Sequence, residues 1–376
     1  MKIGRRTFLF ASATAVACNR HRATAFPGYA FVANAGGKSV AAVDLTRFAV
    51  VRQIRLGSAP STVLAHRQRH AVYTLTPDNG TIYEIDAAGL SIKRKLAIGG
   101  AAASMRFAPD GSALWLLARP APSLVRVALE PLRVVSRVRL PASAGGFDLS
   151  RDGLLATASF PDKQSVGLVD LQRNEVVRVS AAGPDPHAVI FRSDGRQILA
   201  ANRSERMLTI LDVKTGHTLV RLPLPVEPEN CCVKPDGGQV FITGSGMDAV
   251  VVVHPYQTEV AETVLAGSAP GAMAIYATPE YEYLFAANPN TGSVTVLEVY
   301  SREVIAAVTV GQEPCYITFT PDQQYALVVN HRSGDLAVIR IRSIARAREQ
   351  SRSKTAPLFT MIPVGSDPVS AAAVAV

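Results

Sequence analysis

Cysteine is scarce in this chain, with four among 376 residues, at positions 18, 231, 232 and 315. None stands in a CxxCH or CxxC pattern, which excludes covalent c-type haem attachment and a paired zinc site. Cys231 and Cys232 are neighbours, so in a strand their side chains should point to opposite faces. A disulfide from either to Cys315 would have to satisfy strict geometry across two repeats. We therefore expect buried structural thiols.

Familiar catalytic motifs are also missing. The sequence has no glycine-rich phosphate loop, nucleophile elbow or HExxH motif, and its seven histidines show no metal-ligand spacing. The stretch GSGMD at 244–248 lacks the strand–turn–helix context of a nucleophile, and its glycines fit turns of the repeat described below. These absences predict no metal site and no cofactor, and they favour a protein that is not an enzyme.

Charge is sparse and unevenly placed. Only 18% of the residues are charged, and the net charge is +9. Between 340 and 354, six basic residues stand against one acid, Glu349, so much of the surplus is local. A nearly neutral body argues against a nucleic-acid-binding surface. The basic segment 340–354 is the one candidate for nucleic acid, anionic lipid or an acidic partner, but it lacks the interleaved aromatics that stacking on single strands needs. We expect a solvated insertion over 340–357.

The first 25 residues have the composition of an export signal. A basic head is followed by an apolar run of 11 residues from Thr7 to Ala17, too short to span a bilayer. Arg5 and Arg6 before Thr7 resemble the twin-arginine signal. Cys18 after AVA resembles a lipoprotein processing site, and ATA at 23–25 is a competing cleavage site. The sequence predicts a periplasmic or cell-surface protein, with membrane contact only through a lipid anchor at Cys18.

A module of about 42 residues recurs eight times in the rest of the chain. Its landmark is a short apolar strand, which starts at residues 29, 71, 113, 154, 197, 239, 283 and 325. A period of this size, filled with strands and Pro-Asp-Gly turns, is typical of a β-propeller with one four-stranded antiparallel blade per repeat. The sequence predicts an all-β fold of eight blades, or seven if one repeat is degenerate. Residues 197–238 are expected to supply the four strands of one blade.

The two ends of the chain predict how the ring closes. The first module begins at its second strand, at residue 29, and the chain ends on a lone strand of the fourth type at 367–376. That last strand is expected to become the innermost strand of the blade that the N-terminal strands begin, which hides two sheet edges. One domain then covers 26–376.

Several segments resemble the bacterial YVTN-type propeller repeat. They are SVAAVDL at 39–45, LTILDV at 208–213 and VTVGQEPCYITFTPD at 308–322. The resemblance covers roughly 29–376. The wider group includes surface-layer proteins, lactonase-like proteins and haem-binding propellers of the nitrite-reductase type, so the resemblance implies the fold and leaves these activities open.

In such a blade, the start of the innermost strand and the loop after the second strand share one face. Residues there converge on the central channel, where ligands usually bind. The residues expected at the channel mouth are Ser61, Ala103, Gly145, His187, Glu229, Gly271, Cys315 and Val369. The loops of the same face add Asn34, Lys38, Asn202, Arg203, Asn288, Asn330, His331 and Arg332. The ligand-binding candidates are the polar arc His187, Glu229 and Cys315, with Arg203, Asn202, Asn330, His331 and Arg332.

Two interpretations of this arc remain open. In one, His187 is an acid–base or ligand-binding residue tuned by Glu229, and Arg203 or Arg332 holds an anionic group. In the other, His187 caps the start of a strand in a wet channel and Glu229 is a solvated carboxylate.

Three functions follow from these interpretations. The first is a non-enzymatic scaffold that binds a protein partner or small ligand through one face. The second is a lactonase-like hydrolase in which His187, Glu229 and Arg203 converge, around a divalent metal in one form of the hypothesis. The third is a haem- or tetrapyrrole-associated propeller with His187 or His331 as axial ligand.

Overall fold

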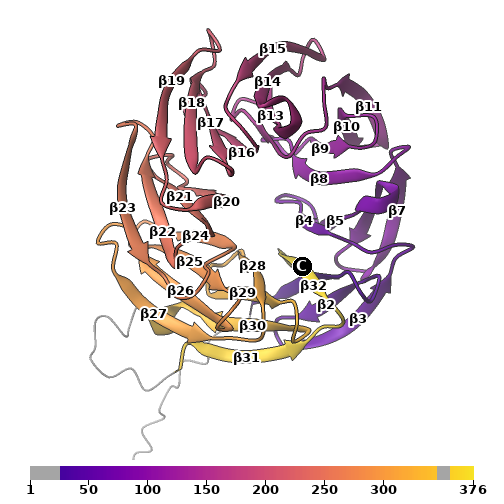
Figure 1. Ribbon diagram of the computed structural model, residues 1–376. Coiled ribbons are helices and arrows are strands. Elements are labelled where there is room, and N and C mark those ends of the chain that lie inside the picture. The colour runs from indigo at the N-terminus through magenta and orange to yellow at the C-terminus, as the bar shows by residue number, and fades with distance from the viewer. Residues whose placement is uncertain (1–25, 345–355) are drawn as a thin grey trace, which may run out of the picture.

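Eight four-stranded antiparallel sheets stand around a central axis in the computed structural model, which describes residues 26–344 and 356–376 (Figure 1). Each sheet is one blade of a β-propeller, with one edge strand beside the channel and the other edge strand at the rim. The prediction of eight blades is confirmed, and the alternative of seven is wrong.

The blades are numbered here in chain order, and each is given from its innermost to its outermost strand. Blades 1 to 4 are β32 (Pro368–Ala375), β1 (Gly28–Asn34), β2 (Ser39–Asp44), β3 (Ala49–Arg55); β4 (Thr62–Ala65), β5 (Ala71–Thr76), β6 (Thr81–Asp86), β7 (Ser91–Ala97); β8 (Ala102–Phe107), β9 (Ala113–Ala118), β10 (Ser123–Leu129), β11 (Leu132–Arg139); and β12 (Phe147–Leu149), β13 (Leu155–Phe160), β14 (Ser165–Asp170), β15 (Glu175–Ala181).

Blades 5 to 8 are β16 (Pro186–Phe191), β17 (Gln197–Asn202), β18 (Met207–Asp212), β19 (Thr218–Pro223); β20 (Glu227–Val233), β21 (Val240–Ser245), β22 (Ala249–His254), β23 (Glu259–Leu265); β24 (Met273–Ala277), β25 (Glu282–Asn288), β26 (Ser293–Glu298), β27 (Val304–Thr309); and β28 (Pro314–Phe319), β29 (Tyr325–Asn330), β30 (Asp335–Arg340), β31 (Leu358–Pro363). Two single-turn 3₁₀ helices, η1 (Pro77–Asn79) and η2 (Pro161–Lys163), follow β5 and β13.

The hydrophobic core lies between adjacent blades. Second strands such as β9 and β29 are buried at every residue, because neighbouring blades cover both faces of the sheet. Outermost strands such as β15 alternate between exposed and half-buried residues, as expected where one face meets water. One core cluster joins Trp115 and Leu117 of blade 3 to Phe147 and Phe160 of blade 4. Each large side chain buried in this way contributes roughly 1.5–3 kcal/mol.

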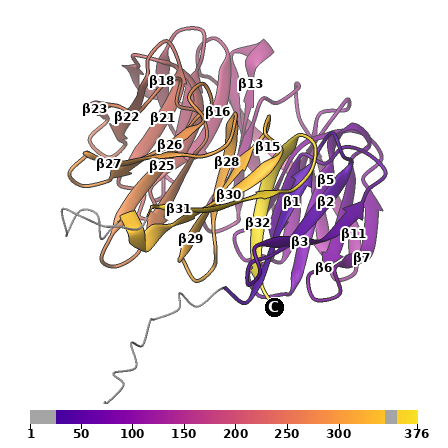
Figure 2. The same ribbon diagram turned by 90° about the horizontal axis from the view of Figure 1, so that it is seen from below.

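The ring closes through its two ends. Strand β1 pairs antiparallel with β32, from Gly28 opposite Ala375 to Asn34 opposite Pro368. Figure 2 shows β32, β1 and β2 side by side. The predicted closure is confirmed: β1 is paired on both sides, by β2 and β32, and β32 is the innermost strand of blade 1.

The assignment of residues 197–238 to one blade is wrong. Strand β20, which contains Cys231 and Cys232, pairs with β21 rather than joining the sheet of β17 to β19. A tight turn explains this, because the Gly237 N–H donates to the Lys234 carbonyl oxygen at 2.7 Å and folds β20 back onto β21. The connection from β19 to β20 instead crosses from one blade to the next.

The basic insertion follows β30 and is described only in part. Residues 341–344 form one helical turn, and the next described residues, 356 and 357, directly precede β31. Arg340 stacks on Phe359, with its guanidinium carbon 4.4 Å from the ring centroid. The other basic residues after Arg342, like the predicted leader and Cys18, lie outside the described residues. No helix within the described part of the chain has the length and apolarity needed to cross a membrane.

Candidate functional site

A cavity of about 480 Å³ occupies the central channel. Its lining residues come from blades 3 to 8, most of them on the innermost strands, and include Arg106, Phe147, His187, Glu229, Met273 and Cys315. The three residues predicted for the polar arc therefore line one cavity. The apolar part of its wall, formed by Val189, Ile190, Met273, Tyr316 and Ile317 among others, was not predicted.

His187, Glu229 and Cys315 share one backbone position, which recurs at Ala103 and Val369 in two other blades. Each of the three is the unpaired residue at a register shift between its innermost strand and the second strand of the blade. Such one-residue bulges redirect a side chain out of the normal alternation of a strand. The residue before each of the three is a proline, Pro186, Pro228 or Pro314, which has no N–H to give to the ladder. The prolines were therefore a signal for the bulges that the sequence already contained.

His187 is half-buried at the cavity wall, and its pKa is lowered. Burial is the main cause, and the positive charge of Arg203 adds to it, while Asp185 and Glu229 act in the opposite direction. The imidazole is therefore neutral near pH 7. Its backbone carbonyl accepts a hydrogen bond from Ser159 Oγ at 3.2 Å, and no described residue hydrogen-bonds to the ring. A neutral ring without a partner can donate, accept or coordinate.

Arg203 is close enough to His187 to act on its pKa but does not line the cavity. Its backbone N–H donates to the Asp185 carbonyl oxygen at 3.1 Å, and its Nε is buried without a hydrogen-bond partner. Glu229 is exposed. Among the described residues, no hydrogen bond or ion pair joins His187, Glu229 and Arg203, although the hydrolase hypothesis requires their contact.

Asn202 and Asn330 lie in the core between blades, outside the cavity lining. Asn202 Nδ2 donates to the Ala182 carbonyl oxygen and to Thr209 Oγ1, both at 2.7 Å. Asn330 Nδ2 donates to Asp335 Oδ1 at 2.7 Å, and a Cβ on Gly311 would lie only 2.6 Å from that nitrogen. Asn34 and Asn288 are equally buried at the ends of β1 and β25. The recurring asparagine is therefore an element of blade packing.

His331 and Arg332 also lie outside the cavity lining. The His331 ring nitrogen Nδ1 is 3.2 Å from the Pro368 carbonyl oxygen, which ties the loop after β29 to blade 1. Arg332 is exposed, and its backbone N–H donates to the Gln312 carbonyl oxygen at 3.2 Å.

The three described cysteines are free thiols. The Cys315 Sγ lies 3.6 Å from the Pro368 carbonyl oxygen, and burial raises the pKa of Cys315 to about 11. Burial likewise raises the pKa of Cys231 to about 12 and of Cys232 to about 11. None is therefore an activated thiolate at neutral pH. Within the part of the chain that the structure describes, no group of three or more His, Cys, Asp or Glu residues is arranged to hold a metal ion.

Comparisons with known proteins agree with this architecture. The family model described as "Lactonase, 7-bladed beta-propeller" matches residues 250–357. No curated protein matches the whole sequence significantly. Among solved structures, dihydro-haem d1 dehydrogenase NirN, in a complex with DHE, has a TM-score of 0.72 at 13% identity, over 92% of this chain and 75% of that chain.

Two further solved structures have a TM-score of 0.59. Hydrazine synthase of Kuenenia stuttgartiensis is 17% identical over 75% of this chain and 95% of that chain. A functionally unknown protein from Desulfotomaculum acetoxidans is 13% identical over 91% of this chain and 98% of that chain. At these identities the likeness shows the fold alone. Together with the family match, it confirms the predicted resemblance to lactonase-like and nitrite-reductase-like propellers.

Proposed function

We propose that this protein is a binding propeller whose channel cavity holds a small, partly apolar molecule that hydrogen-bonds to His187. The observation that carries the proposal is the neutral His187 ring, placed on a bulge at the wall of a cavity and without a hydrogen-bond partner among the described residues. A polar group that faces a cavity unpaired favours a ligand able to pair with it.

The rest of the cavity supports a small ligand. A volume of about 480 Å³ lies within the usual range of about 300–1,000 Å³ for small-molecule sites. The side chains of Val189, Met273 and Ile317 supply apolar surface, while Glu229 and Asn230 supply polar groups that would orient the ligand. The protonated thiol of Cys315, and the lack of a hydrogen bond between Glu229 and His187 within the described residues, favour binding over catalysis.

A tetrapyrrole is the second candidate, favoured by one observation. A neutral imidazole beside an open cavity has the chemistry of an axial haem ligand, and His187 is such a group. NirN, which shares the fold, was solved in a complex with DHE. Binding of haem to His187 should shift the Soret absorption band, and the shift should be lost in the His187→Ala protein.

A thermal-shift screen tests both candidates. Purified protein is melted with lactones, nucleotides, haem and divalent metal ions, with the His187→Ala protein beside it. The proposal expects at least one organic compound to raise the melting temperature of the wild type and not of the variant. Equal shifts in both proteins would place the ligand elsewhere. No shift with any compound would favour a scaffold for a protein partner, and pull-downs would then follow.

Export is part of the same proposal. The predicted twin-arginine leader over 1–25 would carry the protein to the periplasm or cell surface, and Cys18 would tether it if lipidated. Replacing both arginines, Arg5→Lys and Arg6→Lys, should retain the protein in the cytoplasm when cell fractions are compared by immunoblot. An unchanged distribution would remove the twin-arginine route from the proposal.

A further inference from the structure

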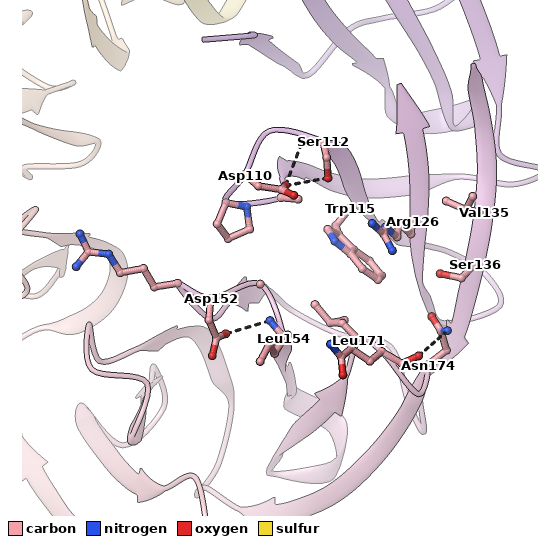
Figure 3. A pocket seen from close by; sticks show the side chains of 15 residues that line it. Asp110, Ser112, Trp115, Arg126, Val135, Ser136, Asp152, Leu154, Leu171 and Asn174 are labelled. Atoms are coloured by element: carbon pink, nitrogen blue, oxygen red, sulfur yellow. Dashed lines mark hydrogen bonds between the residues drawn. The ribbon is translucent and has the colours of Figure 1, made fainter. Parts of the chain in front are cut away.

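We propose a second binding site, in the groove between blades 3 and 4, that accepts a tyrosine side chain from a segment of a partner protein. The groove is a cavity of about 600 Å³ and lies beyond the ends of the innermost strands, on the opposite face from the channel mouth. Figure 3 shows Trp115, Arg126 and Ser136 along one wall, with Asp152, Leu154 and Leu171 facing them. The proposal does not depend on the ligand of the channel.

Two of the seven other grooves between blades carry an exposed tyrosine that stacks on a cation. Between blades 5 and 6, the ring of Tyr256 lies 4.6 Å from the guanidinium of Arg192, and its hydroxyl is 2.7 Å from Ser193 Oγ. Between blades 6 and 7, the ring of Tyr300 lies 4.6 Å from Lys234 Nζ. The cation follows the innermost strand of one blade, and the tyrosine stands two residues after the third strand of the next.

The groove between blades 3 and 4 lacks both members of this pair. Ala108 stands directly after β8, at the position that Arg192 and Lys234 occupy in blades 5 and 6. Gln172 stands two residues after β14, at the position that Tyr256 and Tyr300 occupy in blades 6 and 7. Both Ala108 and Gln172 line the cavity. Six of the eight grooves have no tyrosine at that position, and the one between blades 3 and 4 has an open cavity there.

Arg126 supplies a cation at the wall of this open groove. It is the fourth residue of the third strand, a position that is apolar in six blades: Ala42, Leu168, Ile210, Val252, Val296 and Val338. The other charged residue at this position, Glu84, is buried and paired with Arg94 at 2.6 Å. Arg126 has no ion pair or hydrogen bond within the described residues, and its guanidinium carbon lies 6.0 Å from the ring centroid of Trp115. One face of an aromatic partner could therefore stack on it.

A second unpaired group lies beside Arg126. Ser136 is its cross-strand neighbour on β11, and the Ser136 hydroxyl oxygen is buried without a hydrogen-bond partner. It would serve a phenol hydroxyl as Ser193 serves Tyr256. The carboxylates of Asp110 and Asp152 are engaged in their own turns, by the Ser112 hydroxyl at 2.9 Å and the Leu154 N–H at 3.0 Å.

A protein segment fits this groove better than a free phenol. The cavity is larger than one phenol ring requires, and its rim exposes two apolar side chains, Val135 at 42% and Leu154 at 44%. Apolar groups at a rim gain from contact with residues that flank the tyrosine. We therefore infer that the occupant is a tyrosine within an extended segment of another protein.

Tryptophan fluorescence tests the proposal directly, because Trp115 is the single tryptophan of the chain. The full-length protein is titrated with the blocked tripeptide acetyl-Ser-Tyr-Ser-amide, and Trp115 is excited where tyrosine does not absorb. The proposal expects a saturable change in emission. It also expects weaker binding when the tyrosine of the peptide is replaced by phenylalanine, by about fivefold for one lost hydrogen bond.

Two variants and one matched control locate the site. The double change Ala108→Lys with Gln172→Tyr rebuilds the cation–tyrosine pair and should abolish the titration while thermal melting shows an intact fold. Arg126→Gln keeps the groove open and should weaken binding by about tenfold. Tyr256→Gln opens a different groove and should leave the Trp115 titration unchanged. No saturable change in the wild type, or equal binding to the doubly changed protein, would overturn the proposal. Binding of p-cresol as tight as the tripeptide would overturn the assignment to a protein segment.

Discussion

Two sets of polar residues lie near the same face of the ring, and they differ in burial and in how often they recur in the repeat. The asparagines that end β1, β17, β25 and β29 are buried and recur at one position of the repeat. His187, Glu229 and Cys315 occupy bulges, line the channel cavity and differ from blade to blade. A residue that recurs in four of the eight blades meets a need that those blades share, such as packing. Residues that differ from blade to blade around one cavity are the better candidates for a ligand site.

The largest effect should come from the recurring set. Asn202→Ala removes the hydrogen bonds to the Ala182 carbonyl and Thr209 in a buried place. Loss of these bonds should lower the free energy of unfolding by about 2–3 kcal/mol. Denaturation in urea measures it. The exposed Asn290, changed to alanine, is the matched control and should cost less than about 0.5 kcal/mol. Equal costs for the two changes would contradict the packing role.

His187→Ala should behave in the opposite way. The ring makes no hydrogen bond with the described residues, so we expect a small stability change, below about 1 kcal/mol. Binding of a channel ligand should weaken by about tenfold, since a ligand hydrogen bond to a half-buried group is lost. Isothermal titration calorimetry measures the affinity. A ligand that binds both proteins equally would remove His187 from the site.

Charges around His187 should shift its pKa in opposite directions. Arg203→Gln removes the positive charge that lowers the pKa of His187, so the pKa should rise. Glu229→Gln removes a negative charge that raises it, so the pKa should fall, and by less. Titration of the imidazole by NMR measures both. An unchanged pKa in both variants would show that burial alone sets it.

The smallest expected effect is on how the stability of the protein changes with pH. Because the pKa of His187 is lower in the folded state than its ordinary value of about 6.5, the unfolded chain takes up the proton first as the pH falls. Above a pH of about 6.5, protonation of His187 has no effect on the free energy of unfolding. As the pH falls below that value, the unfolded state binds the proton more readily, and the folded state loses stability. The His187→Ala protein should therefore lose less stability than the wild type between neutral and mildly acidic pH. Parallel stability curves would contradict the lowered pKa.

The fold could be predicted because the same pattern of strands and turns recurs in every repeat. Eight strands at one spacing, and a lone fourth-type strand at 367–376, were enough to predict the blade number and the closure of β1 on β32. The blade limits were harder, because a repeat has no natural starting point. The ladder between β20 and β21, which the Lys234–Gly237 turn connects, shows that β20 belongs to the same blade as β21.

The candidate site could be predicted only in part. Alignment of the repeats brought His187, Glu229 and Cys315 to one level of the channel, and all three line the cavity. Asn202 and Asn330 lie on the expected face, but their side chains are buried in the core instead of lining the channel. Repetition itself was the neglected signal, since Asn34, Asn202, Asn288 and Asn330 end four equivalent strands. The groove between blades 3 and 4 was missed because its main feature, Arg126 beside the Ser136 hydroxyl, depends on the register between two strands.

The most direct test of this account measures the melting temperature of three proteins, with and without a ligand that stabilises the wild type. The wild type, His187→Ala and Asn202→Ala are compared under the same conditions. The account predicts that Asn202→Ala melts at a lower temperature and keeps the full shift with ligand, whereas His187→Ala melts near the wild type and shows no shift. An Asn202→Ala protein of normal stability that no longer responds to ligand would contradict it, since the asparagine would then belong to the site.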